Sequence, residues 1–164
     1  MITFRWFGPR DPIPLAYIRQ IPAVRGIVGA LFDIPVGEPW PLDRIAALRE
    51  DVEFHGMALA VIESIPVHED IKLGRPTRDR LTDNYCESVR NMGRAGVPVL
   101  CYNFMPVFDW MRTDLARRLD DGSTALAFDD ELRAGVIAGQ RRRLEDFGDR
   151  RIIGELTHML QQPL

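Results

Sequence analysis

The feature that most constrains the fold is a series of near-continuous apolar runs separated by stretches with helical spacing. The runs cover residues 26–32, 57–65 and 98–104, and a shorter one covers 2–7. Apolar runs without polar alternation are typical of parallel strands that are covered on both faces. Because helical crossovers between such strands enforce parallel, right-handed connections, we expect the order β-α-β-α-β-α-β.

The stretches between the apolar runs have recognisable helix ends. We expect helices after Pro14, from Pro41 to Gly56, and from Thr77 to the glycines Gly93 and Gly96. Proline favours the first turn of a helix, and glycine favours the residue after the last turn. These ends place each helix between two strands of the expected sheet.

The pattern changes after residue 104. We expect helices at 109–119, 131–147 and 152–160, a turn at 120–123, and no fifth strand. The apolar spacing is weaker here and charged side chains are frequent. Residues 129–164 are therefore interpreted as a helical tail, distinct from 1–128.

Four βα units can form a small open sheet or half of a (β/α)8 barrel. A closed barrel takes about 250 residues, and this chain has 164. The expected fold is therefore α/β: a partial (β/α)8 TIM barrel with about four parallel βα units plus C-terminal helices. The first and fourth strands would leave bare edges, which need another chain or the C-terminal helices to cover them.

Charge and cysteine content narrow the classes of function. The formal charge of −3 argues against a nucleic-acid partner, and the arginines at 141–143 are interpreted as a solvated helix face because Glu145 and Asp146 follow them. Cys86 and Cys101 do not make a disulfide framework, so a reduced cytoplasmic setting is expected. No apolar stretch reaches the ~18 residues of a membrane span.

Polar side chains gather where three of the predicted strands end. Glu63, His68, Glu69, Asp70 and Lys72 follow one apolar run. Tyr102 and Asn103 lie at the end of the next run, and Arg5 lies at the end of the first. The carboxyl ends of parallel strands form the edge at which ligands bind in α/β proteins, so these residues are candidates for a binding site.

The sequence resembles the mannonate dehydratases of the TIM-barrel, xylose isomerase-like type. The motifs that carry the resemblance lie in order along residues 1–128: FRWFGP at 4–9, DP at 11–12, GIVGAL at 26–31, IPVGEPW at 34–40, ESIPVHEDIK at 63–72 and CYNFMPVFDWMRTD at 101–114. The resemblance implies a lyase that converts D-mannonate to 2-keto-3-deoxy-D-gluconate in hexuronate catabolism. It also implies a divalent cofactor, Mn²⁺ or Fe²⁺.

The resemblance also limits what this chain supplies. The family's metal ligands are a cysteine, two histidines and an aspartate from the second half of the barrel, and those positions have no counterpart here. We therefore assign no metal ligand and no catalytic residue, and neither Cys101, His68 nor His158 is placed in that role. We expect the chain alone to be inactive, because loss of one strong electrostatic stabiliser typically costs about 10²–10³ in rate.

Five residues are predicted to bind the sugar acid: Arg5, His68, Lys72, Tyr102 and Asn103. Arg5 would grip the substrate carboxylate, or else form a salt bridge with a neighbouring acidic side chain. The carboxylates beside His68 favour its protonated, donating form, the alternative being a structural loop histidine. Lys72 would neutralise the carboxylate or lie solvated, and Tyr102 and Asn103 would bind sugar hydroxyls.

Other residues have simpler interpretations. Trp6 is expected in the core, Cys86 in helix packing, and His55 on the terminal carbonyls of a helix. Asp109 and Arg112 would pair with each other. Two other functions stay open: a non-catalytic half-barrel that associates with a second copy or a complementing second half, and a small metal-dependent sugar isomerase or epimerase.

Overall fold

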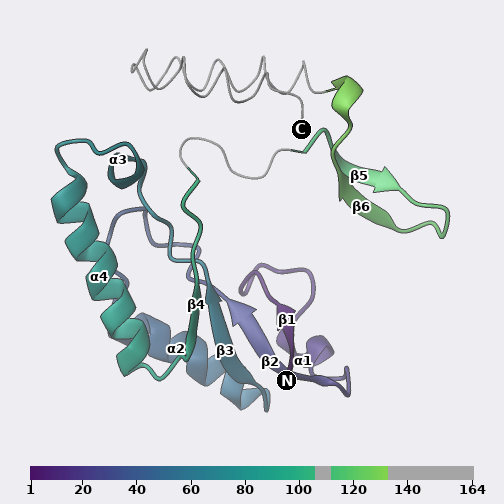
Figure 1. The fold of residues 1–164 in the computed structure, drawn as a ribbon. Coiled ribbons are helices and arrows are strands. Elements are labelled where there is room, and N and C mark those ends of the chain that lie inside the picture. Colours follow the sequence, from purple (N-terminus) through teal and green to yellow (C-terminus); the bar gives the residue numbers. More distant parts are fainter. Residues whose placement is uncertain (106–111, 133–164) are drawn as a thin grey trace. The chain divides into compact units, whose positions relative to one another are not determined.

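The computed structural model describes residues 1–105 and 112–132, which fall into two units (Figure 1). The first unit is Met1–Phe104, and the second is Met105–Leu164. Each unit is described by itself.

The first unit contains a four-stranded sheet. Its strands are β1 (Ile2–Arg5), β2 (Val24–Gly29), β3 (Ala58–Glu63) and β4 (Val99–Cys101). All neighbours pair in parallel, in the order β1-β2-β3-β4. This confirms the predicted α/β class and the order expected for the first four βα units of a barrel.

The helices lie close to their predicted positions. They are α1 (Leu15–Ile18), α2 (Leu42–Phe54), α3 (Glu69–Lys72) and α4 (Arg78–Arg94). The one-turn helix α3 was not expected. Helix α4 continues through Gly93, so only the second of the two glycines ends it.

The structured strands are shorter than the apolar runs that predicted them. After β3, Ile65 and Val67 are buried although they belong to no strand. Apolar composition at 64–67 therefore reflects packing of the β3–α3 loop into the core. Strand β4 has three residues instead of the seven of the run at 98–104, and within the described residues it has a paired neighbour on one side only.

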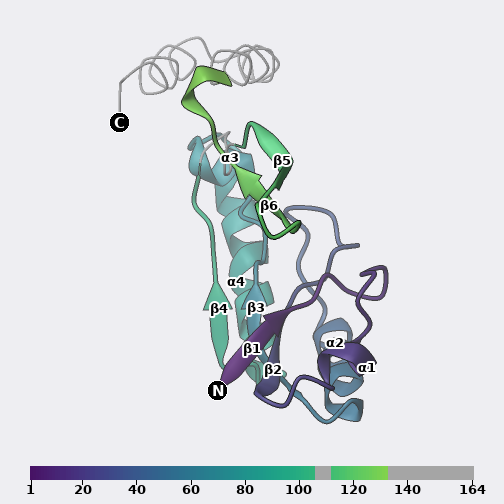
Figure 2. The ribbon, with the colours of Figure 1, turned by 90° about the vertical axis from the view of Figure 1, so that its right-hand side faces the viewer.

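The hydrophobic core lies on one face of the sheet. Ile27 and Ile62 of the sheet are 0% exposed, as are Ile45 and Val52 of α2. Helices α2 and α4 lie on the same side of the sheet in Figures 1 and 2, and α1 contributes Leu15 and Ile18 to the same core. Trp6 also belongs to it, as predicted.

Polar side chains of α4 fix the loop between β2 and α2. Ser88 is completely buried, and its Oγ accepts the main-chain N–H of Trp40 at 2.9 Å. Asn91 donates to the carbonyl of Trp40 at 2.9 Å, and Asn84 donates to the carbonyl of Gly37 at 2.8 Å. Buried hydrogen bonds of this kind set a single position for the loop, because leaving any of these groups unpaired is costly.

The opposite face of the sheet is less covered. Arg5, Val28, Val61 and Val99 form one row across the four strands. Val28 and Val61 are half-buried and Val99 is 45% exposed, in contrast to the fully buried Ile27 and Ile62. Within the described part of the first unit, no helix packs over this row.

The described part of the second unit is a β-hairpin followed by a short 3₁₀ helix. Strands β5 (Asp114–Arg118) and β6 (Thr124–Ala127) pair antiparallel, and η1 spans Asp130–Leu132. The helix expected at 109–119 is therefore wrong for residues 114–118, and the expectation of no further strand is wrong as well. The turn predicted at 120–123 is confirmed, with Gly122 at φ +83°.

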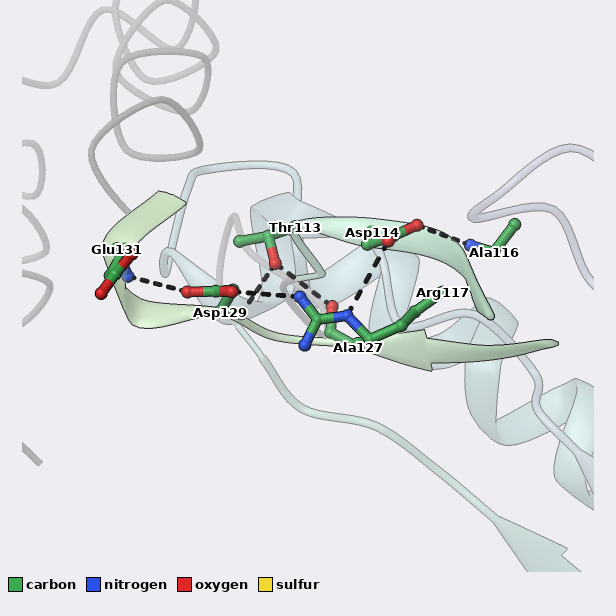
Figure 3. A network of polar contacts seen from close by, with 7 residues as sticks. All are labelled: Thr113, Asp114, Ala116, Arg117, Ala127, Asp129 and Glu131. Carbon is green, nitrogen blue, oxygen red and sulfur yellow. Dashed lines mark hydrogen bonds and ion pairs between the residues drawn. The ribbon is translucent and has the colours of Figure 1, made fainter. Parts of the chain in front are cut away.

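Polar contacts tie the two hairpin strands to the segment that follows (Figure 3). Arg117 lies 3.0 Å from the carboxylate of Asp129 and 3.9 Å from that of Asp114. The hydroxyl of Thr113 accepts the N–H of Asp129 at 2.7 Å. These interactions stabilise a hairpin that its helix-forming residues alone would not predict.

Several predictions fall outside the described residues. These are the helix at 152–160, most of the helix at 131–147, Asp109 with its proposed pairing to Arg112, and His158. The division between 1–128 and a helical tail at 129–164 stays a prediction. Among the described residues, no helix is long and apolar enough to cross a membrane.

Candidate functional site

The candidate site is built on the carboxyl edge of the parallel sheet. Strands β1 and β3 end at Arg5 and Glu63, and β4 ends at Cys101, just before Tyr102 and Asn103. Helix α3, with His68 before it and Lys72 at its end, follows β3 after a short loop. The topology therefore brings all five predicted residues to segments that begin at this edge.

Arg5 interacts with Glu63 across the intervening strand β2. Its Nη1 donates a hydrogen bond to the main-chain carbonyl of Glu63 and lies 3.6 Å from the Glu63 carboxylate. The salt bridge that the sequence left open for Arg5 is thus present. Both side chains are partly exposed, so the ion pair by itself contributes little to stability.

Two aromatic rings also lie against Arg5. The guanidinium carbon is 5.0 Å from the ring centroid of Phe7 and 5.9 Å from that of Phe32. The two rings are 6.2 Å apart and inclined at 38°. An arginine in cation–π contact with aromatic rings can still use its N–H groups for hydrogen bonds.

His68 begins helix α3. Its Nδ1 accepts the main-chain N–H of Asp70 at 3.1 Å, so His68 is the N-cap residue of this helix. Gly37 lies against the imidazole, and a Cβ at that position would be 3.0 Å from His68 Cδ2. Because Nδ1 is an acceptor here, Nε2 is the ring nitrogen that can donate to a ligand.

Lys72 is more buried than a solvated surface lysine. Its Nζ lies 2.7 Å from the Glu69 carboxylate, and its side chain is 11% exposed. The hydroxyl of Thr77 donates to the carboxylate of Asp70, which also lies 3.8 Å from Arg75. Charges on α3 are therefore largely matched within the segment.

Tyr102 and Asn103 follow β4 and are exposed. Tyr102 lines an apolar groove of about 440 Å³ with Leu100 and Phe104. The facing wall comes from α3 and α4 and includes Ile71 and Tyr85. Burial raises the pKa of the Tyr85 phenol, and the neighbouring Tyr102 raises it further.

The structure brings only some of the five predicted residues close to one another. The hydrogen bonds, ion pairs and ring contacts of Arg5 within the described residues go to Glu63, Phe7 and Phe32, not to the other four predicted residues. His68 and Lys72 lie together on α3, and Tyr102 lines the groove beside it. The roles of all five in substrate binding stay predictions.

Two of the three residues around Arg5 were missed as candidates. Glu63 was among the polar residues expected at this edge, because it is the first charged residue after the apolar run at 57–62, but it was not one of the five predicted to bind the substrate. Phe7 and Phe32 gave no such signal, because a phenylalanine near a strand end usually indicates packing. Their contact with a cation becomes visible only when β1 and β2 are placed side by side.

Three further expectations concern residues outside the five. Trp6 is 4% exposed, and its indole N–H has no hydrogen-bond partner among the described residues. His55 Nδ1 lies 2.9 Å from the carbonyl of Asp51, which agrees with a role at the end of α2. Cys86, on α4, is half-buried.

Metal ligands are the other requirement of the implied chemistry. Within residues 1–105 and 112–132, no group of three or more His, Cys, Asp or Glu side chains is placed to hold a metal ion. The described residues therefore do not form a site that fits Mn²⁺ or Fe²⁺.

Comparison with known proteins supports the resemblance. The family model of D-mannonate dehydratase (UxuA) matches residues 1–161. A mannonate dehydratase of Streptococcus uberis is 60% identical over 131 residues, 80% of this chain and 38% of the relative. One from Thermotoga neapolitana is 62% identical over 136 residues, 82% of this chain and 38% of the relative.

A solved structure agrees with these relatives. The crystal structure of mannonate dehydratase from Streptococcus suis serotype 2 matches with a TM-score of 0.81 and 51% identity, over 91% of this chain and 44% of that chain. The chain thus spans about two fifths of the length of the proteins it matches. With a family model covering almost all of its residues, this chain belongs to the D-mannonate dehydratase (UxuA) family.

Proposed function

We propose that this chain supplies part of the substrate-binding edge of a mannonate dehydratase, a lyase that converts D-mannonate to 2-keto-3-deoxy-D-gluconate and water. The observation that carries the proposal is the guanidinium of Arg5, held at the carboxyl edge of the sheet by Glu63 and two aromatic rings. Family membership supports the choice of a sugar acid as the ligand.

The dehydration explains why a fixed cation is useful at this place. Loss of the C2 proton gives an enediolate, loss of the C3 hydroxyl as water gives an enol, and the enol tautomerises to the 2-keto acid. Negative charge grows on the carboxylate oxygens in the first step. A guanidinium bound there stabilises that charge more strongly than it stabilises the ground state.

The other predicted residues have supporting roles in this proposal. Tyr102 and Asn103 bind sugar hydroxyls from the segment after β4. Nε2 of His68 donates to the substrate, and Lys72 adds positive charge close to it, offset by Glu69 at 2.7 Å.

The divalent ion that the family resemblance implies would act as a Lewis acid on the enediolate. Since the described residues gather no ligand set for it, we assign no catalytic step to this chain and propose that the chain alone is inactive. An assay for 2-keto-3-deoxy-D-gluconate with D-mannonate and Mn²⁺ tests this. Turnover by the purified chain would contradict the proposed inactivity.

Substrate binding is tested separately from turnover. Titration with D-mannonate, followed by calorimetry, should detect binding that Arg5→Ala abolishes. D-mannose, which lacks the carboxylate, is the control ligand and should not compete. Equal binding of D-mannonate by the wild-type chain and Arg5→Ala would exclude Arg5 as the carboxylate-binding residue.

A second candidate function is a non-catalytic half-barrel that associates with another polypeptide. The supporting observation is the row of Val28, Val61 and Val99 on the less covered face of a parallel sheet. Gel filtration with light scattering distinguishes the cases. A discrete dimer favours the association module, whereas soluble aggregate favours a barrel portion without its partner.

A further inference from the structure

We infer that Phe32 and Glu63 are positioning residues that hold the Arg5 guanidinium as a preformed receptor for a carboxylate. The inference rests on the proposed function for the identity of the ligand. Neither Phe32 nor Glu63 is among the five residues predicted to bind the substrate.

Two aromatic rings restrain the guanidinium of Arg5. A free arginine side chain populates many rotamers, so an exposed one binds a ligand only after it has been ordered. Phe7 is two residues beyond Arg5, and its centroid lies 5.0 Å from the guanidinium carbon. Phe32 comes from the segment after β2 and approaches to 5.9 Å.

The ring of Phe32 packs closely against a glycine. Gly8 adopts φ +88°, and a Cβ there would lie 3.3 Å from Cδ2 of Phe32. Only a residue without a side chain allows the ring this close approach without displacement. The loop after β1 and the loop after β2 therefore meet at the ring that stacks on Arg5.

Glu63 restrains one nitrogen of the guanidinium. Nη1 donates to the main-chain carbonyl of Glu63, and the Glu63 carboxylate lies 3.6 Å away. Within the described residues, Nε and Nη2 make no hydrogen bond. The Nε–Nη2 edge has the spacing that takes both oxygens of a carboxylate.

The groups that hold Arg5 thus differ from those that would bind the ligand. Phe7, Phe32 and Glu63 restrain the guanidinium. Nε and Nη2 make no hydrogen bond within the described residues and are available for the carboxylate. Removal of the Phe32 ring should therefore loosen Arg5 without removing any group that touches the carboxylate. Phe32 and Phe7 are both more than half exposed, so their loss does not open the core.

Nuclear magnetic resonance of the arginine side chains tests the positioning directly, in the ligand-free chain. Restricted rotation about the Nε–Cζ bond of Arg5 should give distinct Nη1 and Nη2 proton signals, assigned by their loss in Arg5→Lys. Phe32→Leu should merge these signals, and Phe32→Tyr, which retains the ring, should preserve them. Glu63→Gln should broaden them, because the carboxylate no longer attracts Nη1.

Affinity for D-mannonate supplies the second measurement. Phe32→Leu should weaken binding about 3- to 10-fold, since ordering one long side chain on binding carries a cost of that size. Phe32→Tyr should restore binding to within about twofold. Phe54→Leu and Glu53→Gln, which remove an exposed ring and an arginine-paired carboxylate from α2, are matched controls and should leave it unchanged.

The two measurements test the positioning role and the identity of the ligand separately. Arg5 signals that are the same in Phe32→Leu and in the wild-type chain would overturn the positioning role, whatever the affinity for D-mannonate. If the signals change as expected but the wild-type chain binds no D-mannonate, the positioning role stands and the proposed sugar-acid ligand is wrong.

Discussion

His68 shows how the role of one side chain depends on which of its atoms are already bound. Its Nδ1 accepts the N–H of Asp70, so the ring caps α3 with one nitrogen and has the other for a ligand. Removing the ring should cost about 1 kcal/mol of unfolding free energy, the usual value of an N-cap. For a chain of 164 residues, we expect His68→Ala to lower the melting temperature by about 2–4 °C, measured by circular dichroism.

The variant His68→Asn separates capping from other effects of the ring. Asparagine is a strong N-cap residue, so it should recover most of the stability lost in His68→Ala. It should not recover a contribution of Nε2 to ligand binding. Equal destabilisation by alanine and asparagine would show that packing of the imidazole against Gly37, rather than the cap, stabilises this segment.

Gly93 and Gly96 make a matched pair at the end of α4. Gly93 is helical, and a Cβ there meets nothing within 4 Å, so Gly93→Ala should stabilise the protein by about 0.5–1 kcal/mol. Gly96 has φ +75°, and its Cβ would lie 2.7 Å from Nη1 of Arg49, which also donates to the Ala95 carbonyl. Gly96→Ala should destabilise by about 1 kcal/mol or more.

Urea denaturation of both variants measures the free energy of unfolding, which should increase in Gly93→Ala and decrease in Gly96→Ala. The comparison is internal because both changes add one methyl group to the same helix end. If both substitutions destabilised the protein, the left-handed conformation of Gly96 would not be the deciding difference between the two sites.

At the scale of elements, the β5–β6 hairpin depends on charge more than on apolar burial. Arg117 donates to the Asp129 carboxylate at 3.0 Å, and this bond is the main reason that the pKa of Asp129 is lowered from its ordinary 3.8. A carboxyl whose pKa is depressed in the folded state stabilises the fold above its unfolded pKa. That stabilisation is lost as the pH falls through the depressed value.

Carboxyl ¹³C titration of Asp129 checks this cause. In Arg117→Gln the pKa of Asp129 should rise toward 3.8, and the hairpin should lose order at a higher pH than in the wild-type chain. Asp121 is the control, because its pKa is lowered chiefly by the hydroxyl of Ser123 and should not move. An unchanged pKa of Asp129 in Arg117→Gln would mean that the hydrogen bond from the N–H of Glu131, not Arg117, lowers it.

The same hairpin shows where sequence reasoning reaches its limit. Periodicity predicted the parallel sheet because each buried strand is an apolar run whose signal is local to it. Residues 114–118 contain leucine, alanine and arginine, which favour helix, and they form a strand only because 124–127 pairs with them. The local spacing of residues does not reveal which segment a strand pairs with. The turn at 120–123, in contrast, was predicted from its own residues.

In the candidate site too, the sequence predicted some features and not others. Arg5, Tyr102 and Asn103 were predicted from their place after apolar runs, and the topology does bring them to the ends of β1 and β4. The contacts that restrain Arg5 come from Phe32 and Glu63, 27 and 58 positions further along the chain. Such contacts follow from which strands are neighbours, and a single sequence does not reveal them.

For the chain as a whole, the two faces of the sheet differ in a way that a parallel sheet does not normally tolerate. Ile27 and Ile62 are 0% exposed on the helix-covered face, while Val99, in the row with Val28 and Val61, is 45% exposed. Parallel sheets are usually covered on both faces, and the relatives continue for more than half of their length beyond the matched part. An apolar row and an edge strand together favour association with another chain.

This predicts that the purified chain self-associates and that a charge on the edge strand opposes it. Light scattering should give a mass above the 18.7 kDa of one chain, and Val99→Lys should lower it. Val36→Lys is the matched control, since Val36 is similarly exposed but lies in the loop between β2 and α2, and it should leave the mass unchanged. A wild-type chain that stays monomeric at every concentration would show that this face and edge are covered within a single molecule.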